Sequence, residues 1–413
     1  MLFLGFSAGL PFLLVFSTLS AWLTEEGLSR TTIGFFSWVG ITYSVKVIWA
    51  PFVDYLRLPF LTRMLGRRRA WMLLAQLGIA AGLVAMALTE PQSQLVLFAL
   101  LAVFIAFCSA TQDIVVDAYR IEAMDREYQA AMAATYIFGY RVALLVAGAG
   151  AFYAAEFQGW SGSYLIMAAC MAVGIVTTLI IVEPRRGEGE QAVSVLSEGV
   201  GRWFVTAVVH PFTDFFQRNG HLALLILLFI GIYRISDITM GVMANPFYLD
   251  MGYTKIQIAE VSKIFGFFMT IVGAGLGGVL VLRYGVMRML IVGAALVAVT
   301  NLLFAGLANA APDVTLLALV ISADNLSGGI ATTVFIAYLS SLTHTAYTAT
   351  QYALFSSLMT LPAKFISGFS GIVVDGHGYF SFFVYAAALG VPAIAIAVWL
   401  AWRSRRGPTG LTG

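Results

Sequence analysis

Ten ionisable side chains lie inside long apolar stretches of this sequence, and this combination strongly restricts how the chain can fold. A membrane-spanning helix needs about 20 mostly apolar residues. Twelve stretches meet that length, near residues 2–22, 32–53, 70–89, 94–118, 129–153, 162–182, 221–249, 257–282, 287–308, 313–341, 348–374 and 379–402. A charge at bilayer depth is costly, so such side chains usually pair, line a water-filled cavity or carry ions. The pattern is typical of membrane transporters.

The composition excludes a soluble protein. Of the 413 residues, 60% are hydrophobic and only 11% are charged, and the mean hydropathy is +0.89. A chain this apolar cannot form a water-exposed surface of ordinary composition. Apolar runs of spanning length form helices, whereas the strands of a membrane barrel alternate apolar and polar residues. The sequence therefore predicts an all-α polytopic membrane protein.

Lysine and arginine gather on one side of the twelve spans when these are threaded in order. The positive-inside rule places that side in the cytoplasm. Its loops hold Arg57, Arg63, Arg67, Arg68, Arg69, Arg120, Arg126, Arg185, Arg186, Arg202, Arg218, Arg283, Arg288, Arg403, Arg405 and Arg406, whereas the opposite loops hold only Arg30 and Lys255. We expect both termini in the cytoplasm, with residues 2–22 as the first span and not a signal peptide, because no basic n-region precedes them. The loop near 342–348 has no basic residue, so the last two spans rest on hydropathy alone.

A long polar segment, residues 183–220, divides the chain into two groups of six spans. It predicts an N-terminal six-helix bundle over 1–182, a C-terminal bundle over 221–403 and a short tail over 404–413. Inside the linker, apolar residues recur at helical spacing and indicate an amphipathic surface helix, at Val193, Leu196, Val200, Trp203, Phe204 and Ala207. Similar basic, glycine-containing turns follow spans 2 and 8, as expected for two rocking halves. This pattern favours the architecture of a major facilitator, with two six-helix halves around a central cavity.

Two carboxylates in span 4 point to proton transfer. Asp113 and Asp117 are four residues apart and therefore share one helix face. Two such groups in a poorly solvated place cannot both ionise cheaply, which suits a proton carrier. The alternative is that Asp117 lies at the cytoplasmic end and pairs with Arg120, so that only Asp113 is deep.

The remaining charges in the spans suggest a binding site for an anion. Arg234 and Asp237, three residues apart, either neutralise one another or leave the arginine to clamp a substrate carboxylate. Four further basic residues have no partner on their own helix, namely Lys46, Arg141, Lys263 and Lys364. Asp324 is the expected long-range partner for one of them, and Glu260 is expected near the membrane interface. Because acids and bases balance, protonating a carboxylate would leave the cavity positive and able to receive an anion.

Other residues are assigned more weakly. Gly9 permits close helix packing, and Gly9 with Pro11 is expected to bend span 1, either as a gate or as an ordinary membrane-helix kink. Trp49 either anchors the interface or stacks on a sugar ring. Cys108 and Cys170 lie in spans without metal or disulfide spacing. We expect no metal, no cofactor and no enzymatic activity, because no nucleophile and base lie together in the spans.

The sequence resembles a known family, the AmpG-type muropeptide permeases of the major facilitator superfamily. The most specific match is the span 4 string from Ala106 to Ala118, which contains Gln112 and Asp113. The other matching stretches are 5–11, 32–37, 46–54 with Asp54, 66–69, 139–141, the spacing from Tyr233 to Asp237, Lys263, Asn325–Leu326 with Gly328–Gly329, and 349–351 with Gln351.

The resemblance implies a proton-driven importer of anhydromuropeptides in the Gram-negative inner membrane, serving peptidoglycan recycling and informing β-lactamase induction. Together with the charges in the spans, it leads us to expect proton coupling by Asp113, Asp117, Asp237 and Asp324. We expect substrate binding by Lys46, Trp49, Gln112, Arg141, Arg234, Lys263, Asn325, Gln351 and Lys364. Gating is expected from Asp54, Arg67, Arg68, Arg69, Gly9 and Pro11. The expected partners are the sugar-peptide solute, protons and lipid, with a monomer as the working unit. An iron-siderophore permease is the alternative; a membrane transferase or a transporter-like sensor would represent a different class.

Overall fold

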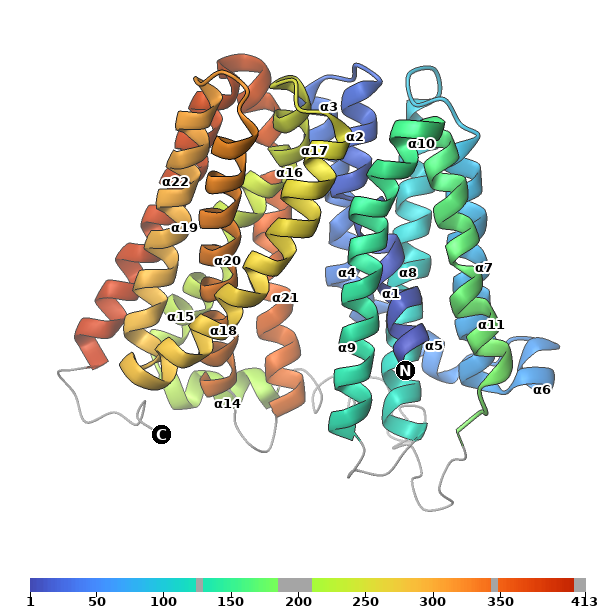
Figure 1. The fold of residues 1–413 in the computed structure, drawn as a ribbon. Helices are drawn as coiled ribbons and strands as arrows, with labels where there is room; N and C mark the ends of the chain where they lie inside the picture. The colour runs from blue at the N-terminus through green and yellow to red at the C-terminus, as the bar shows by residue number, and fades with distance from the viewer. Residues whose placement is uncertain (124–128, 185–209, 343–347, 405–413) are drawn as a thin grey trace. The chain divides into compact units, whose positions relative to one another are not determined.

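Every regular element in the described part of the chain is a helix (Figure 1). The computed structural model describes residues 1–123, 129–184, 210–342 and 348–404. Within these ranges, nine helical stretches are long and apolar enough to cross a membrane, which makes the chain a multi-pass membrane protein. One of the nine, Ala134–Ile180, covers two of the predicted spans. The count of twelve spans stays a prediction.

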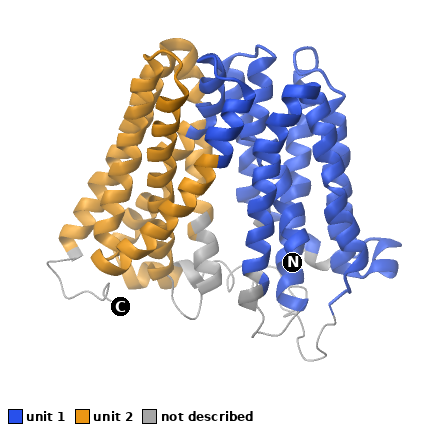
Figure 2. Cartoon of the chain, viewed as in Figure 1, with its two compact units in different colours: residues 1–187, 241–264 blue, residues 188–240, 265–413 orange. Residues whose placement is uncertain are grey.

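The chain forms two compact units, of residues 1–187 with 241–264 and of residues 188–240 with 265–413 (Figure 2). The first unit contains α1 (Leu2–Leu14), α2 (Ser17–Glu25), α3 (Arg30–Phe36), α4 (Ile41–Val45), α5 (Ala50–Tyr55), α6 (Leu61–Leu65), α7 (Arg67–Ala87), α8 (Leu95–Ala123), α9 (Gln129–Leu145), α10 (Ala151–Cys170) and α11 (Ala172–Ile180). It also holds α17 (Lys255–Ile258) and most of a π-helix, η6 (Ala259–Phe265).

The second unit contains α14 (His210–Asn219), α15 (Leu222–Ile232), α18 (Gly266–Tyr284), α19 (Val286–Ala308), α20 (Val314–Leu342), α21 (Thr348–Ser367) and α22 (Ser370–Ser404). Helix α16 (Ile235–Asp250) begins in this unit and ends in the first. The two predicted six-helix halves therefore stay a prediction, and the expected amphipathic helix over 193–207 lies outside the described residues.

Glycines with positive φ recur at corresponding places in the two halves of the sequence. Gly66 (φ 89°) directly precedes α7, and Gly285 (φ 82°) directly precedes α19. Gly159 (φ 70°) kinks α10, and Gly378 (φ 75°) kinks α22. Only glycine adopts this backbone region without a steric penalty. The same turns at the same points indicate a repeated helical plan.

The predicted span 32–53 is not a continuous helix. After α3, the chain passes through a 3-10 turn, η1 (Ser37–Gly40), then α4, a second 3-10 turn, η2 (Lys46–Ile48), and α5. Such 3-10 interruptions often mark strain or a functional hinge. Lys46 therefore sits at a break between two short helices.

Close helix packing in the first unit depends on glycines of α1 and α9. A methyl group at Gly5 would lie 2.1 Å from the Tyr136 carbonyl oxygen, and one at Gly9 would lie 2.7 Å from that of Tyr140. Helix α1 continues through Pro11, and its break comes later, at Val15–Phe16. The packing interpretation of Gly9 agrees with this contact, and a gating bend at Gly9 and Pro11 stays a prediction.

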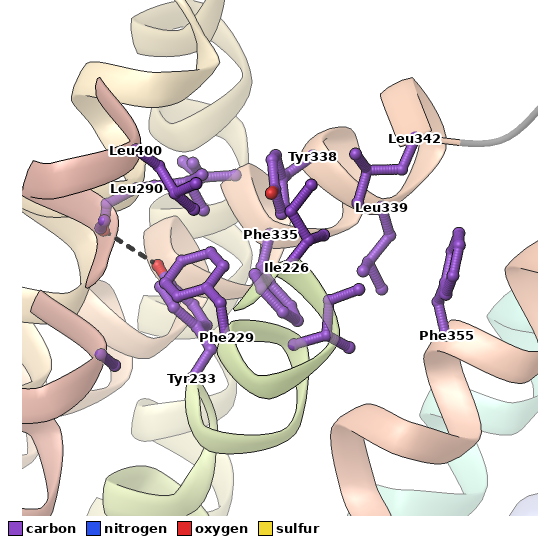
Figure 3. Packing of buried hydrophobic residues seen from close by; sticks show 14 of the residues in the cluster. Ile226, Phe229, Tyr233, Leu290, Phe335, Tyr338, Leu339, Leu342, Phe355 and Leu400 are labelled. Carbon is purple, nitrogen blue, oxygen red and sulfur yellow. Dashed lines mark hydrogen bonds between the residues drawn. The ribbon is translucent and has the colours of Figure 1, made fainter. Parts of the chain in front are cut away.

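The second unit has a large aromatic core (Figure 3). Tyr233 stacks on Phe335 with ring centroids 4.2 Å apart, and Phe229 makes edge contacts with both Phe335 and Tyr338. The Tyr233 hydroxyl donates to the carbonyl oxygen of Leu290 at 3.3 Å. This core fixes the end of α15 and so positions Arg234, the next residue.

Candidate functional site

An ion pair joins Lys46 at η2 to Asp113 on α8 in the first unit. The Lys46 Nζ lies 3.5 Å from the Asp113 Oδ2, and the two side chains are 35% and 18% exposed. The other carboxylate oxygen, Oδ1, is buried and has no hydrogen-bond partner among the described residues. A buried oxygen without a partner is costly in a native structure and calls for an explanation such as a proton, water or bound group.

Two hydroxyl oxygens near this pair are also buried without a hydrogen-bond partner among the described residues. The oxygens of Tyr43 and Ser109 are buried and make no well-formed hydrogen bond in the part of the chain that the structure describes. Ser109 and Asp113 are four residues apart on α8 and share a face. The Tyr43 ring packs on Phe12 and Phe16, with centroids 5.8 and 5.9 Å away. Sequence reasoning missed Tyr43 and Ser109, because their burial depends on tertiary packing.

Two other predicted substrate contacts, Trp49 of span 2 and Gln112 of span 4, make hydrogen bonds to neighbouring helices. The Trp49 Nε1 donates to the Thr111 Oγ1 at 3.1 Å, and its ring lies against Phe107. Gln112 is fully buried and accepts from the Ser7 Oγ at 3.4 Å. The Gln112 Nε2, like the Asp113 Oδ1, is buried and has no hydrogen-bond partner among the described residues.

Asp117 lies in the structural arrangement that the sequence allowed as an alternative. Its side chain is 53% exposed, and its Oδ1 lies 3.6 Å from the Arg120 guanidinium. The ion pair follows the helical i, i+3 spacing, and Asp113 is the deeper of the two carboxylates.

Lys263 lies in the π-helix η6, which is a form of backbone frequently found at functional sites. Its Nζ donates to the Asn245 Oδ1 at 2.9 Å and lies 5.5 Å from the centre of the Phe152 ring. Asn245 in turn donates to the carbonyl oxygen of Ser17. No carboxylate pairs with Lys263 among the described residues. Sequence reasoning missed Asn245.

Arg234 and Asp237 form the predicted pair in the second unit. Arg234 falls in the break between α15 and α16, and its guanidinium contacts the Asp237 carboxylate and donates to the Thr332 Oγ1 at 2.9 Å. Both residues line a small pocket with Tyr233 and Ser236. The pair is thus neutralised within the turn, although it remains partly accessible.

Asp324 does not pair with a basic residue in the described part of the chain. Its Oδ1 accepts from the Thr300 Oγ1 at 3.2 Å. The expectation of a long-range ion pair is therefore wrong, because a hydroxyl on the adjacent α19 satisfies the carboxylate. Its neighbour Asn325 accepts from the Thr270 Oγ1 at 2.9 Å and holds α20 to α18.

The remaining predicted substrate contacts are placed as follows. Arg141 on α9 is exposed and has no ion-pair partner among the described residues. Lys364 lies half-buried on α21. The side chains of Gln351 and Asp54 lie outside the described residues.

The basic turn before α7 binds two carboxylates. The Arg68 guanidinium makes a two-point contact with Glu122, at 2.6 and 3.0 Å. The Glu183 carboxylate accepts from the backbone nitrogens of Arg68 and Arg69, at 2.8 and 3.1 Å, and so caps the start of α7. Arg69 also donates to the carbonyl oxygens of Thr178 and Leu179. Arg67, the residue before Arg68, is half-buried. Neither Glu122 nor Glu183 was predicted.

Comparison with known proteins identifies the family of the chain. The Major Facilitator Superfamily profile matches residues 1–363. The chain is 36% identical over 398 residues to the anhydromuropeptide permease of Escherichia coli K12, covering 96% of this chain and 78% of that protein. It is 34% identical over 400 residues to a transporter named AmpG 4 of Rickettsia conorii, covering 96% and 94%.

Solved structures show the same fold at low sequence identity. The nucleoside transporter NupG matches with a TM-score of 0.71 at 12% identity, over 97% of this chain and 98% of that one. A POT family transporter in complex with a thioalcohol-conjugated peptide matches with a TM-score of 0.70 at 15% identity, over 100% and 96%. The helical plan, the charges in the spans and these similarities lead to one conclusion: the chain belongs to the major facilitator superfamily and, within it, to the AmpG-type permeases.

Proposed function

We propose that this protein is a proton-coupled importer of anhydromuropeptides, which carries N-acetylglucosaminyl-anhydromuramyl peptides from periplasm to cytoplasm by alternating access. The identity to the Escherichia coli permease over nearly the whole chain supports the solute class. The observation that best supports coupling is the Lys46–Asp113 pair, in which one buried carboxylate oxygen has no partner among the described residues.

The coupling step follows from the charges of this pair. While Asp113 is ionised, it neutralises Lys46. A proton on the unpartnered Oδ1 would cancel the carboxylate charge and release the lysine ammonium to bind an anionic group. The peptide carboxylates of the solute supply such a group, and charge-assisted hydrogen bonds of this kind are the strong ones. Proton and solute would therefore bind together and be released together.

The other predicted site residues join this proposal in two groups. Arg141 and Lys263, neither held by a carboxylate among the described residues, would bind the acidic end of the solute. Trp49, Gln112, Arg234, Asn325, Gln351 and Lys364 are proposed further contacts, and Asp117, Asp237 and Asp324 are proposed auxiliary carboxylates. Location in the inner membrane, cytoplasmic termini and a monomeric working unit are part of the same proposal.

Uptake into proteoliposomes tests the proposal. Labelled N-acetylglucosaminyl-anhydromuramyl peptide should accumulate under an inward proton gradient, and the accumulation should collapse when a protonophore is added. An iron-loaded siderophore offered to the same vesicles is the matched control and should not accumulate. Uptake of the siderophore in place of the muropeptide would contradict the solute assignment, and uptake indifferent to the protonophore would contradict coupling.

A further inference from the structure

A six-residue pattern occurs twice in the chain, after α2 and after α16. Residues 25–30 are Glu-Glu-Gly-Leu-Ser-Arg, and residues 250–255 are Asp-Met-Gly-Tyr-Thr-Lys. Each copy begins with an acid at the last residue of a helix and ends with a base at the first residue of the next. The order in both is acid, glycine turn, hydroxyl cap and base.

The backbone of the two copies is also the same. Gly27 and Gly252 both have positive φ, of 75° and 89°. Ser29 accepts a hydrogen bond from the Thr32 backbone nitrogen, and Thr254 accepts one from that of Gln257. Side-chain caps of this kind fix where a helix begins. Each base is therefore held at a defined point, close behind a reversal of the chain.

The charged ends of the two copies pair crosswise. Arg30 of the first copy binds Asp250 of the second through two contacts, with the Nε at 2.8 Å from the Oδ2. Lys255 of the second copy binds Glu25 of the first, with the Nζ at 3.0 and 3.1 Å from the two oxygens. All four residues belong to the first compact unit, whose helices α2, α3, α10 and α17 gather at one end (Figure 1).

Helix α10 supports one of the two pairs. The Trp160 Nε1 donates to the Glu25 Oε2 at 2.8 Å, and the Lys255 Nζ lies 6.0 Å from the centre of the Trp160 ring. Glu156 lies 3.8 Å from the same lysine. Glu156 therefore adds a second carboxylate on the same side as Glu25, and the two acids hold Lys255 together.

The basic residues of the two copies are exceptions to the predicted distribution of lysine and arginine in the chain. Arg30 and Lys255 are the two basic residues that the predicted topology places on the periplasmic side. The positive-inside bias acts against basic residues in such loops. Both of these exceptions are held by acids, at 16% and 18% side-chain exposure. The acids that hold them, Asp250 and Glu25, are 33% and 31% exposed, so each pair is open to solvent and weak enough to break and form again.

We propose that the two crossed ion pairs are a latch, which holds the ends of α2 and α16 together and closes the periplasmic side of the transporter. The latch must open in each transport cycle, when Arg30 leaves Asp250 and Lys255 leaves both Glu25 and Glu156. This inference rests on the proposed transport function and adds to it the residues that control access from outside.

Labelling of a reporter cysteine tests the latch without any solute or proton gradient. The reporter is Lys263→Cys in a Cys108→Ser/Cys170→Ser background, two turns deeper than Lys255 along the same helix. It is treated with a membrane-impermeant maleimide in right-side-out vesicles. Arg30→Asp or Asp250→Arg should speed labelling about tenfold by shifting the population toward the open state. The swapped variant Arg30→Asp/Asp250→Arg should return to within about twofold of the parent, because it restores the pair.

Glu90→Lys is the matched control, since it reverses an exposed acid in another loop on the same predicted side, and it should leave labelling unchanged. Equal labelling in parent and single reversals, or a swapped variant as fast as the single ones, would overturn the latch. If a reversal does not fold, the milder Arg30→Gln and Asp250→Asn answer the same question: faster labelling supports the latch and an unchanged rate contradicts it. Failed muropeptide uptake would refute the proposed solute and leave this result intact.

Discussion

The Lys46–Asp113 pair of the first unit and the Arg234–Asp237 pair of the second unit carry the same charges but differ in construction. Lys46 reaches Asp113 across two elements, at 3.5 Å, and one buried oxygen of the carboxylate has no partner among the described residues. Arg234 and Asp237 lie three residues apart, and the arginine is bound further by Thr332. The first pair is incompletely satisfied, whereas the second is satisfied by its own turn.

This difference separates a group that can change its charge from a group that stabilises the fold. A carboxylate with a free oxygen and a single long contact gains or loses a proton at small structural cost. In an ion pair formed within one turn, removing either charge leaves the other charge without a partner. This is strongly destabilising in a poorly solvated place. We therefore expect the main coupling proton at Asp113, whereas changes at Arg234 and Asp237 should affect the stability of the fold more than coupling.

The largest effect is expected from Asp113→Asn. The amide cannot exchange a proton, so accumulation driven by a proton gradient should be lost completely. Exchange of labelled for unlabelled solute across the membrane, which needs no net proton movement, should persist. Proteoliposome uptake and counterflow measure the two activities. Normal accumulation by this variant would remove Asp113 from the proton pathway.

Substitutions in the Arg234–Asp237 pair should change the stability of the fold more than proton coupling. Arg234→Gln should lower the free energy of unfolding by about 1–3 kcal/mol, somewhat less than for a fully buried pair, because both side chains keep some exposure. The double variant Arg234→Gln/Asp237→Asn should recover at least half of that loss, measured by denaturation in detergent. By contrast, Lys46→Gln/Asp113→Asn should not recover accumulation. Recovery there would erase the distinction between the two pairs.

A smaller effect is expected at Asn245, which positions Lys263. Asn245→Ala should weaken solute binding about tenfold, because a hydrogen bond to a charged group contributes about 1.5–3 kcal/mol. Equilibrium binding to purified protein measures it, and Asn219→Ala on α14 provides a control substitution. Lys263→Ala should weaken binding at least as much. Unchanged affinity in both variants would show that this lysine contributes only to packing.

The smallest effect is expected from Asp117→Asn. The side chain is 53% exposed and its contact with Arg120 is a helical pair of the kind that contributes only about 0.3–0.5 kcal/mol. Accumulation should therefore stay within about twofold of the parent. A loss as severe as that of Asp113→Asn would mean that the two carboxylates share the proton, as their spacing on one helix face allows.

How much the sequence could predict depended on whether a contact is local. The Arg234–Asp237 and Asp117–Arg120 pairs follow helical spacing and were predictable from position alone. The partner of Lys46 was not, because it depends on a broken segment, η2, packing against α8. Asp324 shows the same limit, since Thr300 on a neighbouring helix satisfies it. The paired turns at Gly66 and Gly285 were suggested by the sequence, but Glu183, which caps one of them from the far end of α11, was not.

The fold class and family were predictable because they rest on length and hydropathy summed over many residues. The helix breaks were not, because they depend on single backbone positions. Span 1 is interrupted at Val15–Phe16 and not at Pro11, since a membrane helix tolerates a proline whose freed carbonyl can be satisfied nearby.

Proton movement driven by the solute tests the central claim most directly. Proteoliposomes with a trapped pH indicator and no imposed gradient receive an inward gradient of unlabelled muropeptide. The account predicts acidification of the interior by the parent protein and none by Asp113→Asn, although the variant still exchanges solute. Equal acidification by both proteins would contradict the assignment of proton coupling to the Lys46–Asp113 pair.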